Sequence, residues 1–362
     1  MPILRPEQLI DELYGPPKKE SRIEDFKKKG VTKPDKTETW ETELEEKLTL
    51  REQYEEQIEI LKQAGILEKL SSGEMGIIDI NGREKPIPAY SRIQEQISQN
   101  QEILEKKREQ GFNQLLLVPF GLKLDSLIAK YEQVIREHHQ QSKLLAAKKE
   151  PTDSDEPLEL DEDRPIWVWT SNEPGQGYNN ADTEGKIFYY PKEFSQNHQG
   201  RTKQELLETE LSSGWNILLT EDLPNIPRKN QGKETAGRHQ IDTAGTSIKQ
   251  YIKQGEEIPC PAEYLTAIQS EPAYQNEQGL TPEDQITYAI IHLKKTNQAI
   301  DDWQGHGSIS YQLGAYFPDA GGLPRAYWRR VRRQAGLGRD GPGRRIDYCG
   351  ARSAVPAGVG GS

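Results

Sequence analysis

The last 67 residues of this 362-residue chain contain no lysine and no glutamate, although these two residue types supply 67 of the first 295 residues. Arginine, glycine and alanine take their place, and the nine arginines between Arg325 and Arg352 are opposed by only Asp340 and Asp347. That span carries a net charge of +7 in a chain whose total is −11, which leaves −18 for the remainder. A positive segment on an acidic chain predicts either a binding face or a disordered tail that holds nucleic acid through phosphate charge alone.

Cysteine and long apolar runs are also scarce. Cys260 and Cys349 cannot form a disulfide framework, and no CxxC pair is present for zinc. No apolar run approaches the ~20 residues needed to span a bilayer, so we expect no membrane insertion. The N-terminus lacks the basic-then-apolar layout of a secretory signal. A cytoplasmic location is the default expectation, and the sequence leaves export or surface display open.

The common catalytic motifs are missing as well. The chain has no GxxxxGK[ST], no GxGxxG after a strand and no GxSxG. The nearest metal-ligand set is His292, Asp301, Asp302 and His306, but about three helical turns separate His292 from Asp302, so these groups need not meet. Cys349 lies among arginines that would lower its pKa if they were close, yet no histidine in that stretch could act as its base. We therefore predict no catalytic residue, no metal site, no cofactor and no enzymatic activity.

Large apolar side chains argue that the C-terminal stretch is folded. Disordered segments rarely carry enough apolar surface to bury. Gly321-Gly322, the Asp340–Gly343 segment and Cys349-Gly350 supply turn signals that divide the stretch into short extended pieces. We predict a loop-rich β segment built on the following residues: Tyr316, Phe317, Leu323, Tyr327, Trp328, Val331, Leu337, Ile346, Tyr348 and Val355.

The N-terminal part predicts a polar flexible arm over residues 1–36 and an α-rich module over 37–149. Apolar residues at helical spacing indicate three helices, and FNQLLLVPF reads as a buried strand. Asn81-Gly82 is a strong signal for a two-residue hairpin. We also expect this module to support homo-oligomerisation. The helices are expected at residues 40–64, 91–111 and 124–138.

Residues 150–164 form an acidic stretch, in which EPTDSDEPLELDED contains eight acids and no base. Like charges repel and the prolines stiffen the chain, so we predict a linker and a domain boundary here. The alternative is that these acids pair with the arginine-rich end of the same chain.

Aromatic and β-branched runs begin after the acidic stretch, at residues 165–170, 186–190 and 215–220. Short helices are expected at 246–254 and 261–269, and a return to strand at 305–313. Thr281, Pro282 and Asp284 predict the capped start of a long helix. The fold class indicated for the whole chain is α+β.

The C-terminal half contains the segments GLTPEDQITYAIIHLKKTNQAIDDWQGHGSISYQLGAYFP, PRAYWRRVRRQAGL, GPGRR and GARSAV. These segments resemble the variable proteins of diversity-generating retroelements, in particular a bacterial group with a similar α-rich N-terminal module. The likeness extends through GFNQLLLVPFGLKL and RPIWVW and covers most of the chain. It implies a C-type-lectin-like (formylglycine-generating-enzyme-like) domain over 165–355, a variable region at about 320–352, and a Gly-rich tail at 356–362.

In that family a reverse transcriptase randomises template adenines, chiefly in Asn AAY codons. Replacing both adenines of such a codon cannot give Lys, Glu, Gln, Met or Trp, so Trp328 and Gln334 belong to the scaffold, and Leu337 is assigned there too. Because the gap in Lys and Glu begins upstream of the variable stretch, scaffold composition explains part of it. The resemblance implies these variable, ligand-binding positions, all reachable from an AAY codon: Gly322, Arg325, Tyr327, Arg329, Val331, Arg332, Gly336, Gly338, Asp340, Gly341, Arg344, Ile346, Tyr348 and Cys349.

The function that the resemblance implies is non-enzymatic ligand binding by a positively charged, diversified surface. Arginine and tyrosine are enriched at interface hot spots, and positive charge favours an acidic protein or an anionic glycan as partner. The alternative is a nucleic-acid-binding protein that uses the arginine-rich tail as an extended arm. A third hypothesis, an enzyme of the formylglycine-generating fold, would need an active-site cysteine or a metal site that the sequence does not present.

Overall fold

The computed structural model describes residues 39–148, 152–209, 213–221, 260–305, 307–346 and 348–358, and side chains from residue 49 onward. The predicted arm at 1–36 and the predicted helix at 246–254 lie outside these residues. The chain divides into two compact units, 1–56 and 57–362. Helix α3 (Thr39–Gln63) begins in the first unit, where Arg51 Nε donates to Glu55 Oε1 at 3.0 Å one turn away.

The second unit contains the predicted hairpin, but its loop has three residues, 80–82, instead of the two predicted, because the Asp79 amide pairs with the Arg83 carbonyl. The Asp79 carboxylate accepts hydrogen bonds from the backbone amides of Asn81 and Arg83, both at 2.9 Å, and Gly82 adopts a left-handed φ of 75°. A turn of this kind needs a residue that tolerates positive φ, which glycine does without steric cost. The hairpin strands are β2 (Met75–Ile78) and β3 (Glu84–Pro86), with β1 (Glu68–Lys69) pairing to β2.

The helix expected at 91–111 is broken into α4 (Tyr90–Gln99) and α5 (Gln101–Glu109). Asn100 leaves the helical region at φ −118°, ψ 20°, and its side-chain amide donates to the Gln96 carbonyl at 3.0 Å. Asparagine competes for backbone hydrogen bonds in this way, which explains the break. The apolar pattern continues on both sides of it and therefore gave no sign of the interruption.

The predicted domain boundary at 150–164 is wrong, because elements from both sides of it pack into one unit. Strand β4 (Gln114–Val118), from the segment assigned to the N-terminal module, pairs along its full length with β7 (Asn216–Thr220) from beyond the acidic stretch. Within the acidic stretch Leu158 and Leu160 are buried, and Leu145 pairs with Pro157, so the stretch is anchored instead of acting as a linker. The sheet is antiparallel, in the order β4 (Gln114–Val118), β7 (Asn216–Thr220), β15 (Ser353–Pro356), β8 (Gln278–Gly279).

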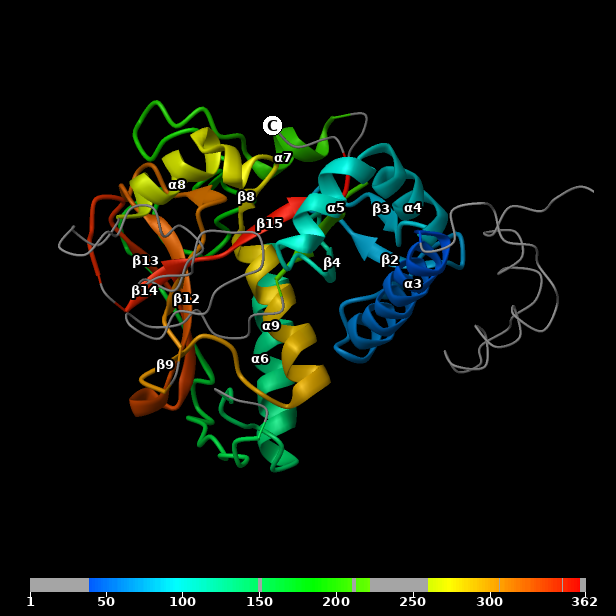
Figure 1. Ribbon diagram of the computed structural model, residues 1–362. Helices are drawn as coiled ribbons and strands as arrows, with labels where there is room; N and C mark the ends of the chain where they lie inside the picture. Colours follow the sequence, from blue (N-terminus) through cyan, green and yellow to red (C-terminus); the bar gives the residue numbers. More distant parts are fainter. Residues whose placement is uncertain are drawn as a thin grey trace, which may run out of the picture. The chain divides into compact units, whose positions relative to one another are not determined.

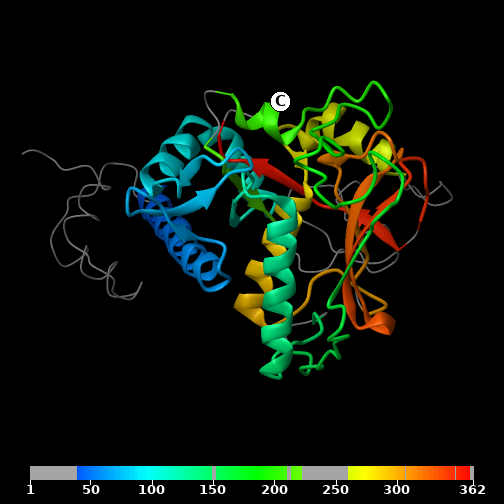
Figure 2. The ribbon, with the colours of Figure 1, turned by 180° about the vertical axis from the view of Figure 1, so that it is seen from behind.

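Two long helices pack against each other beside this sheet, as Figure 1 and Figure 2 show from opposite sides. They are α6 (Leu124–Gln140), which matches the predicted third helix, and α9 (Pro282–Thr296). The predicted cap of α9 is present: Thr281 Oγ1 accepts from the Asp284 amide at 3.2 Å, and the Thr281 amide donates to Asp284 Oδ2 at 2.9 Å. Every residue of α9 from Pro282 to Leu293 is buried, so this helix is central to the core.

A second, mixed sheet contains most of the C-terminal stretch, which is therefore folded as predicted. One face of this sheet packs on α9 through β12 (Leu323–Arg329). Helix α8 (Pro261–Ser270) covers part of the other face, where Tyr264 and Ile268 pack with Tyr311 and Cys349. Smaller elements are the pair β6 (Phe188–Tyr189) with β11 (Ala315–Tyr316), and α7 (Lys203–Leu207). The order is β14 (Cys349–Ala351), β10 (Ile309–Tyr311), β12 (Leu323–Arg329), β13 (Gln334–Asp340), β5 (Ile166–Val168), with β9 (Asp302–Trp303) also on β12.

The chain is thus an α+β protein. Among the described residues, no helix combines the length and apolar character required to cross a membrane.

Candidate functional site

The hairpin of β12 and β13 separates the predicted variable positions from the predicted scaffold. Arg325 lies opposite Gly338 and Tyr327 opposite Gly336, and directly opposed residues project from the same face of a sheet. Successive residues alternate between faces. Trp328 and Leu337, assigned to the scaffold, therefore project from the opposite face, and each is only 1% exposed.

Aromatic rings and guanidinium groups form a continuous surface on the outer face. The Trp303 ring lies edge-on to Tyr327, with centroids 5.7 Å apart, and stacks on Tyr348 at 5.4 Å. Arg329 lies 5.4 Å above Trp303, and Arg325 lies 5.6 Å above Tyr327. Such cation–π contacts hold arginine side chains against the sheet while their edges stay available for hydrogen bonds. We call these five residues the Arg-aromatic face.

A groove of about 680 Å³ runs along this face. Trp167, Arg325, Tyr327, Arg329 and Arg332 line it. Its floor depends on glycine, because a Cβ atom at Gly336 would lie 2.5 Å from the Tyr327 ring and one at Gly338 would lie 3.3 Å from Trp167. Asp161 and Asp163 also line the groove, so its charge is mixed.

Most of the arginine charge in this region is neutralised within the protein, which corrects the expectation of a strongly positive face. Six of the nine arginines between Arg325 and Arg352 contact carboxylates; among the described residues only Arg329, Arg332 and Arg339 have no ion-pair partner. The alternative pairing with the acidic stretch is confirmed. The pairs are Arg325–Asp340, Arg330–Asp302, Arg330–Glu156, Arg333–Glu159, Arg344–Asp340, Arg345–Glu263 and Arg352–Asp301.

The fourteen predicted variable positions are unequally accessible. Eight are exposed or half-buried: Arg325, Arg329, Val331, Arg332, Gly341, Arg344, Ile346 and Tyr348. Six are buried: Gly322, Tyr327, Gly336, Gly338, Asp340 and Cys349. Val331, at the turn between β12 and β13, is 69% exposed and is the one exposed large hydrophobic side chain among the described residues.

Cys349 is the clearest departure from expectation. Its side chain is 0% exposed and packs in the cluster under α8. Burial raises the pKa of Cys349 to about 12, and this outweighs the opposing effects of the Tyr311 hydrogen bond and of Arg325. Nearby Arg325 and Arg344 do lower the pKa, as expected for close arginines, but desolvation exceeds their effect. Cys349 is a core residue and cannot contact a ligand in this structure.

The candidate metal ligands do not converge. Asp301 contacts Arg352 and accepts from Gln285 Nε2 at 2.7 Å, while Asp302 binds Arg330. Burial, with smaller effects of Arg352 and Lys295, lowers the pKa of His292 to about 4. His306 lies outside the described residues. No group of three potential metal-binding side chains occurs in the part of the chain that the structure describes.

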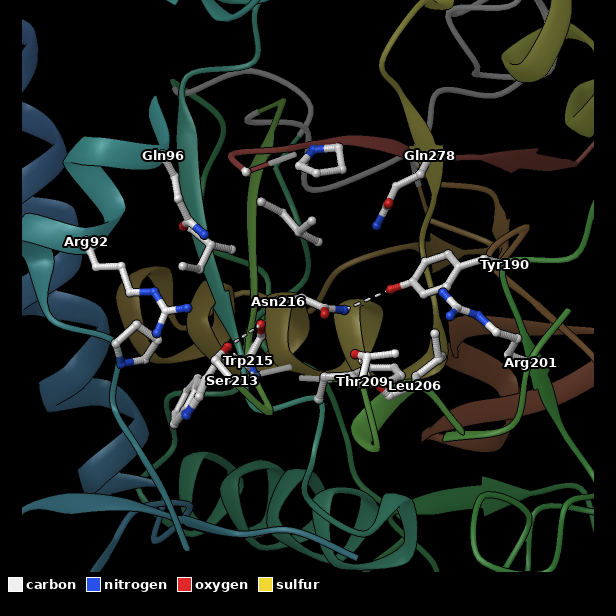
Figure 3. Close-up of a pocket in the computed structure, with 16 residues that line it drawn as sticks. Arg92, Gln96, Tyr190, Arg201, Leu206, Thr209, Ser213, Trp215, Asn216 and Gln278 are labelled. Atoms are coloured by element: carbon white, nitrogen blue, oxygen red, sulfur yellow. Dashed lines mark hydrogen bonds between the residues drawn. The ribbon is translucent and has the colours of Figure 1, made fainter. Parts of the chain in front are cut away.

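A second pocket, of about 230 Å³, lies over β7 and was not predicted (Figure 3). Arg92 and Gln96 of α4 lie on one side of it, Tyr190 and Arg201 lie on the other, and Asn216 of β7 lies between them. No motif could have indicated this pocket, because its lining comes from segments as far apart as Pro88 and Gly358 and depends on the pairing of non-local strands.

A scan against protein-family models finds no match for this chain, and neither the curated proteins nor the solved structures contain one.

Proposed function

We propose that this chain is a non-enzymatic ligand-binding protein whose Arg-aromatic face is diversified by a retroelement. The fold of residues 165–355 is assigned as C-type-lectin-like on the strength of the sequence resemblance. The ligand contacts the outer face of β12 and β13 together with Trp303, Tyr348 and the turn that carries Val331.

The observation that carries the proposal is the alternation along β12 and β13. The predicted variable positions on β12, namely Arg325, Tyr327 and Arg329, share one face, and the intervening Trp328, which no AAY codon can give, projects into the core. A substitution on the outer face changes the chemistry of the groove without altering the packing on α9. Segregation of this kind is what a surface needs if its specificity is to vary while its fold is kept.

Tyr327 and Cys349 limit the proposal in different ways. Tyr327 is 8% exposed but lines the groove, so it acts from the groove floor. Cys349 is removed from the set of ligand-contacting residues because it is enclosed in the core. The remaining contact groups combine planar rings, guanidinium groups and one exposed aliphatic side chain, a mixture typical of protein-recognition surfaces.

The ligand class that fits is an acidic protein surface or an anionic glycan, bound through Arg329 and Arg332, which have no carboxylate partner among the described residues and both line the groove. Arg329 lies 5.4 Å above the Trp303 ring, which holds its guanidinium against the outer face. Because six other arginines are already ion-paired, we expect moderate salt dependence.

Nucleic-acid binding by a flexible arm is the weaker alternative. The arginine-rich stretch is paired into a sheet, and Glu156, Glu159 and Glu263 occupy guanidinium groups that would otherwise bind phosphates. Heparin, a sulfated glycan, and a short DNA duplex provide a comparison. We expect heparin binding to weaken about tenfold when Arg329 and Arg332 are both changed to Gln. Arg108→Gln on α5 is the matched control, because Arg108 lines neither this groove nor the pocket over β7. Tighter binding to the duplex than to heparin would favour the nucleic-acid alternative.

The DNA around the gene tests the retroelement directly. The expected result is a near-identical template repeat that differs from the codons for Arg325 to Tyr348 only at adenines and lies beside a reverse transcriptase gene. A locus with neither feature would overturn diversification, while the heparin experiment would still report whether the face binds ligands.

A further inference from the structure

The pocket over β7 differs in charge from the surface of the chain as a whole. The protein has 58 acidic residues and a net charge of −11, yet none of the described residues that line this pocket is acidic. Two of them are arginines, Arg92 and Arg201. Both side chains are exposed, and neither has an ion-pair partner in the described part of the chain. A concave site that concentrates positive charge on an acidic protein favours an anion over a neutral ligand.

The floor between the two arginines is polar and held in place. Asn216 Nδ2 donates to the Tyr190 hydroxyl oxygen at 3.0 Å (Figure 3). The same amide nitrogen lies 3.3 Å from Asp284 Oδ1 at the start of α9. Asp284 is itself fixed by the Thr281 cap. Asn216 and Tyr190 are therefore preorganised, which reduces the entropy lost when a ligand binds to them.

Further amides face the same space. Gln278 and Gln96 line the pocket, and Gln96 Oε1 is buried with no hydrogen-bond partner in the described part of the chain. An acceptor left in this state costs free energy unless a donor reaches it, and a ligand hydroxyl is such a donor. Amide groups can donate and accept at once, so a set of them fits a molecule with several hydroxyls. Phe120 and Trp215 supply apolar wall.

We infer that this pocket binds a monosaccharide-sized polyol that carries one anionic group, with either Arg92 or Arg201 holding the anion and Asn216, Gln278 and Gln96 pairing with the hydroxyls. The volume of about 230 Å³ suits a molecule of this size. The anion is a carboxylate or a phosphate, since guanidinium groups bind both through paired hydrogen bonds. This site is separate from the Arg-aromatic face, because no residue lines both the pocket and the groove.

Titration calorimetry on the full chain tests the inference with four probes. Glucuronate carries hydroxyls and a carboxylate, glucose 6-phosphate carries hydroxyls and a phosphate, glucose carries hydroxyls alone, and acetate carries a carboxylate alone. We expect one or both of the first two to bind at low millimolar concentration, and glucose and acetate to bind about tenfold more weakly or less. The stronger of the first two identifies the anion. Equal binding of glucose, or equal binding of acetate, would overturn the inference, as would the absence of binding by both hydroxylated anions.

Variants assign the site. One of the variants Arg92→Gln and Arg201→Gln should weaken binding of the stronger probe about tenfold, and that variant identifies the arginine that holds the anion. Arg108→Gln, which removes a guanidinium that lines neither the pocket nor the groove, should leave binding of the probe unchanged. Tyr190→Phe removes the hydroxyl group that Asn216 contacts on the pocket floor and keeps both arginines. An unchanged melting temperature shows that each variant is folded. Binding that survives both arginine changes would place the anion elsewhere and reject this pocket.

Discussion

Arg330 and Glu156 are 174 residues apart in the sequence, yet Arg330 Nη1 lies 2.6 Å from Glu156 Oε1. The same guanidinium donates from Nη2 to the buried Asp302 carboxylate, also at 2.6 Å. These hydrogen bonds raise the pKa of Arg330, the Asp302 contact being the largest cause. One side chain at the turn between β12 and β13 therefore ties that turn both to the core and to the acidic stretch.

The two partners of Arg330 should differ in their contribution to stability. Arg330→Ala leaves the Asp302 charge buried without its guanidinium and should lower the free energy of unfolding by about 3 kcal/mol. Glu156→Gln, at a side chain that is more than half exposed, should lower it by about 0–1 kcal/mol. Urea unfolding followed by circular dichroism measures both, and equal effects would contradict the assignment of Asp302 as the main anchor.

Asp284 should make stability decrease between about pH 4 and pH 7. Burial is the largest cause that raises its pKa, from 3.8 to about 7, so the folded protein retains a proton that the unfolded chain releases in this range. Because the folded state binds more protons, the contribution of Asp284 falls as pH rises through that window and is level above it. Asp284→Asn should remove this component from the pH dependence of the unfolding free energy.

His292 provides the control with the opposite sign. Its pKa is lowered from 6.5 to about 4, mainly by burial, so its contribution is fully present above about pH 6.5 and is lost as pH falls toward 4. His292→Gln should therefore change the slope in the direction opposite to Asp284→Asn. If the two variants shift the slope in the same direction, at least one of these protonation states is misassigned.

Gly336 should be sensitive to a single added methyl group. A Cβ atom there would lie 2.5 Å from the Tyr327 ring, which must move or strain the sheet. We expect Gly336→Ala to lower stability by about 1–3 kcal/mol and to perturb the near-UV circular dichroism of the aromatic cluster. Gly341→Ala is the matched control, since no atom lies within 4 Å of its Cβ position, and it should have neither effect.

The two cysteines should be inert in the folded protein. Cys349 and Cys260 are both buried, and the pKa of Cys349 is about 12, so little thiolate is present and little of it is accessible. Reaction with a chromogenic disulfide reagent at mildly alkaline pH should be slow before denaturant is added and fast afterwards. The variant Cys260→Ser isolates Cys349, and rapid labelling of that variant while folded would show that the α8 cluster opens.

Local structure was largely predictable from the residues. The helix at Leu124–Gln140, the capped start of α9 and the strand at Gln114–Val118 each depend on near neighbours in the sequence, and each is present. The absence of a domain boundary at residues 150–164 was not predictable, because their acidic composition gave no indication that Leu158 and Leu160 are buried.

The candidate sites show the same limit. The alternation of β12 side chains between the two faces of the sheet could be predicted from sequence once a strand was assumed. The ion pairs that reduce the positive charge of the arginine-rich stretch could not, because they join Arg330 and Arg333 to residues 174 positions away. Burial of Cys349 depends on α8, and the pocket at Asn216 depends on helices and strands from distant parts of the chain. Contacts between residues far apart in the sequence can be predicted only when the two positions vary together among homologous sequences.

The order β4-β7-β15-β8 has a kinetic consequence. Strand β15 lies inside the sheet although it follows the other three strands in sequence, and it pairs on one side with β7, whose first residue precedes it by more than a hundred positions. During synthesis the sheet cannot reach its final register until Ser353–Pro356 has left the ribosome. Until then β7 and β8 keep unpaired edges, and closing such long loops slows folding. We therefore expect nascent chains stopped before Ser353 to depend on chaperones, however stable the completed protein is.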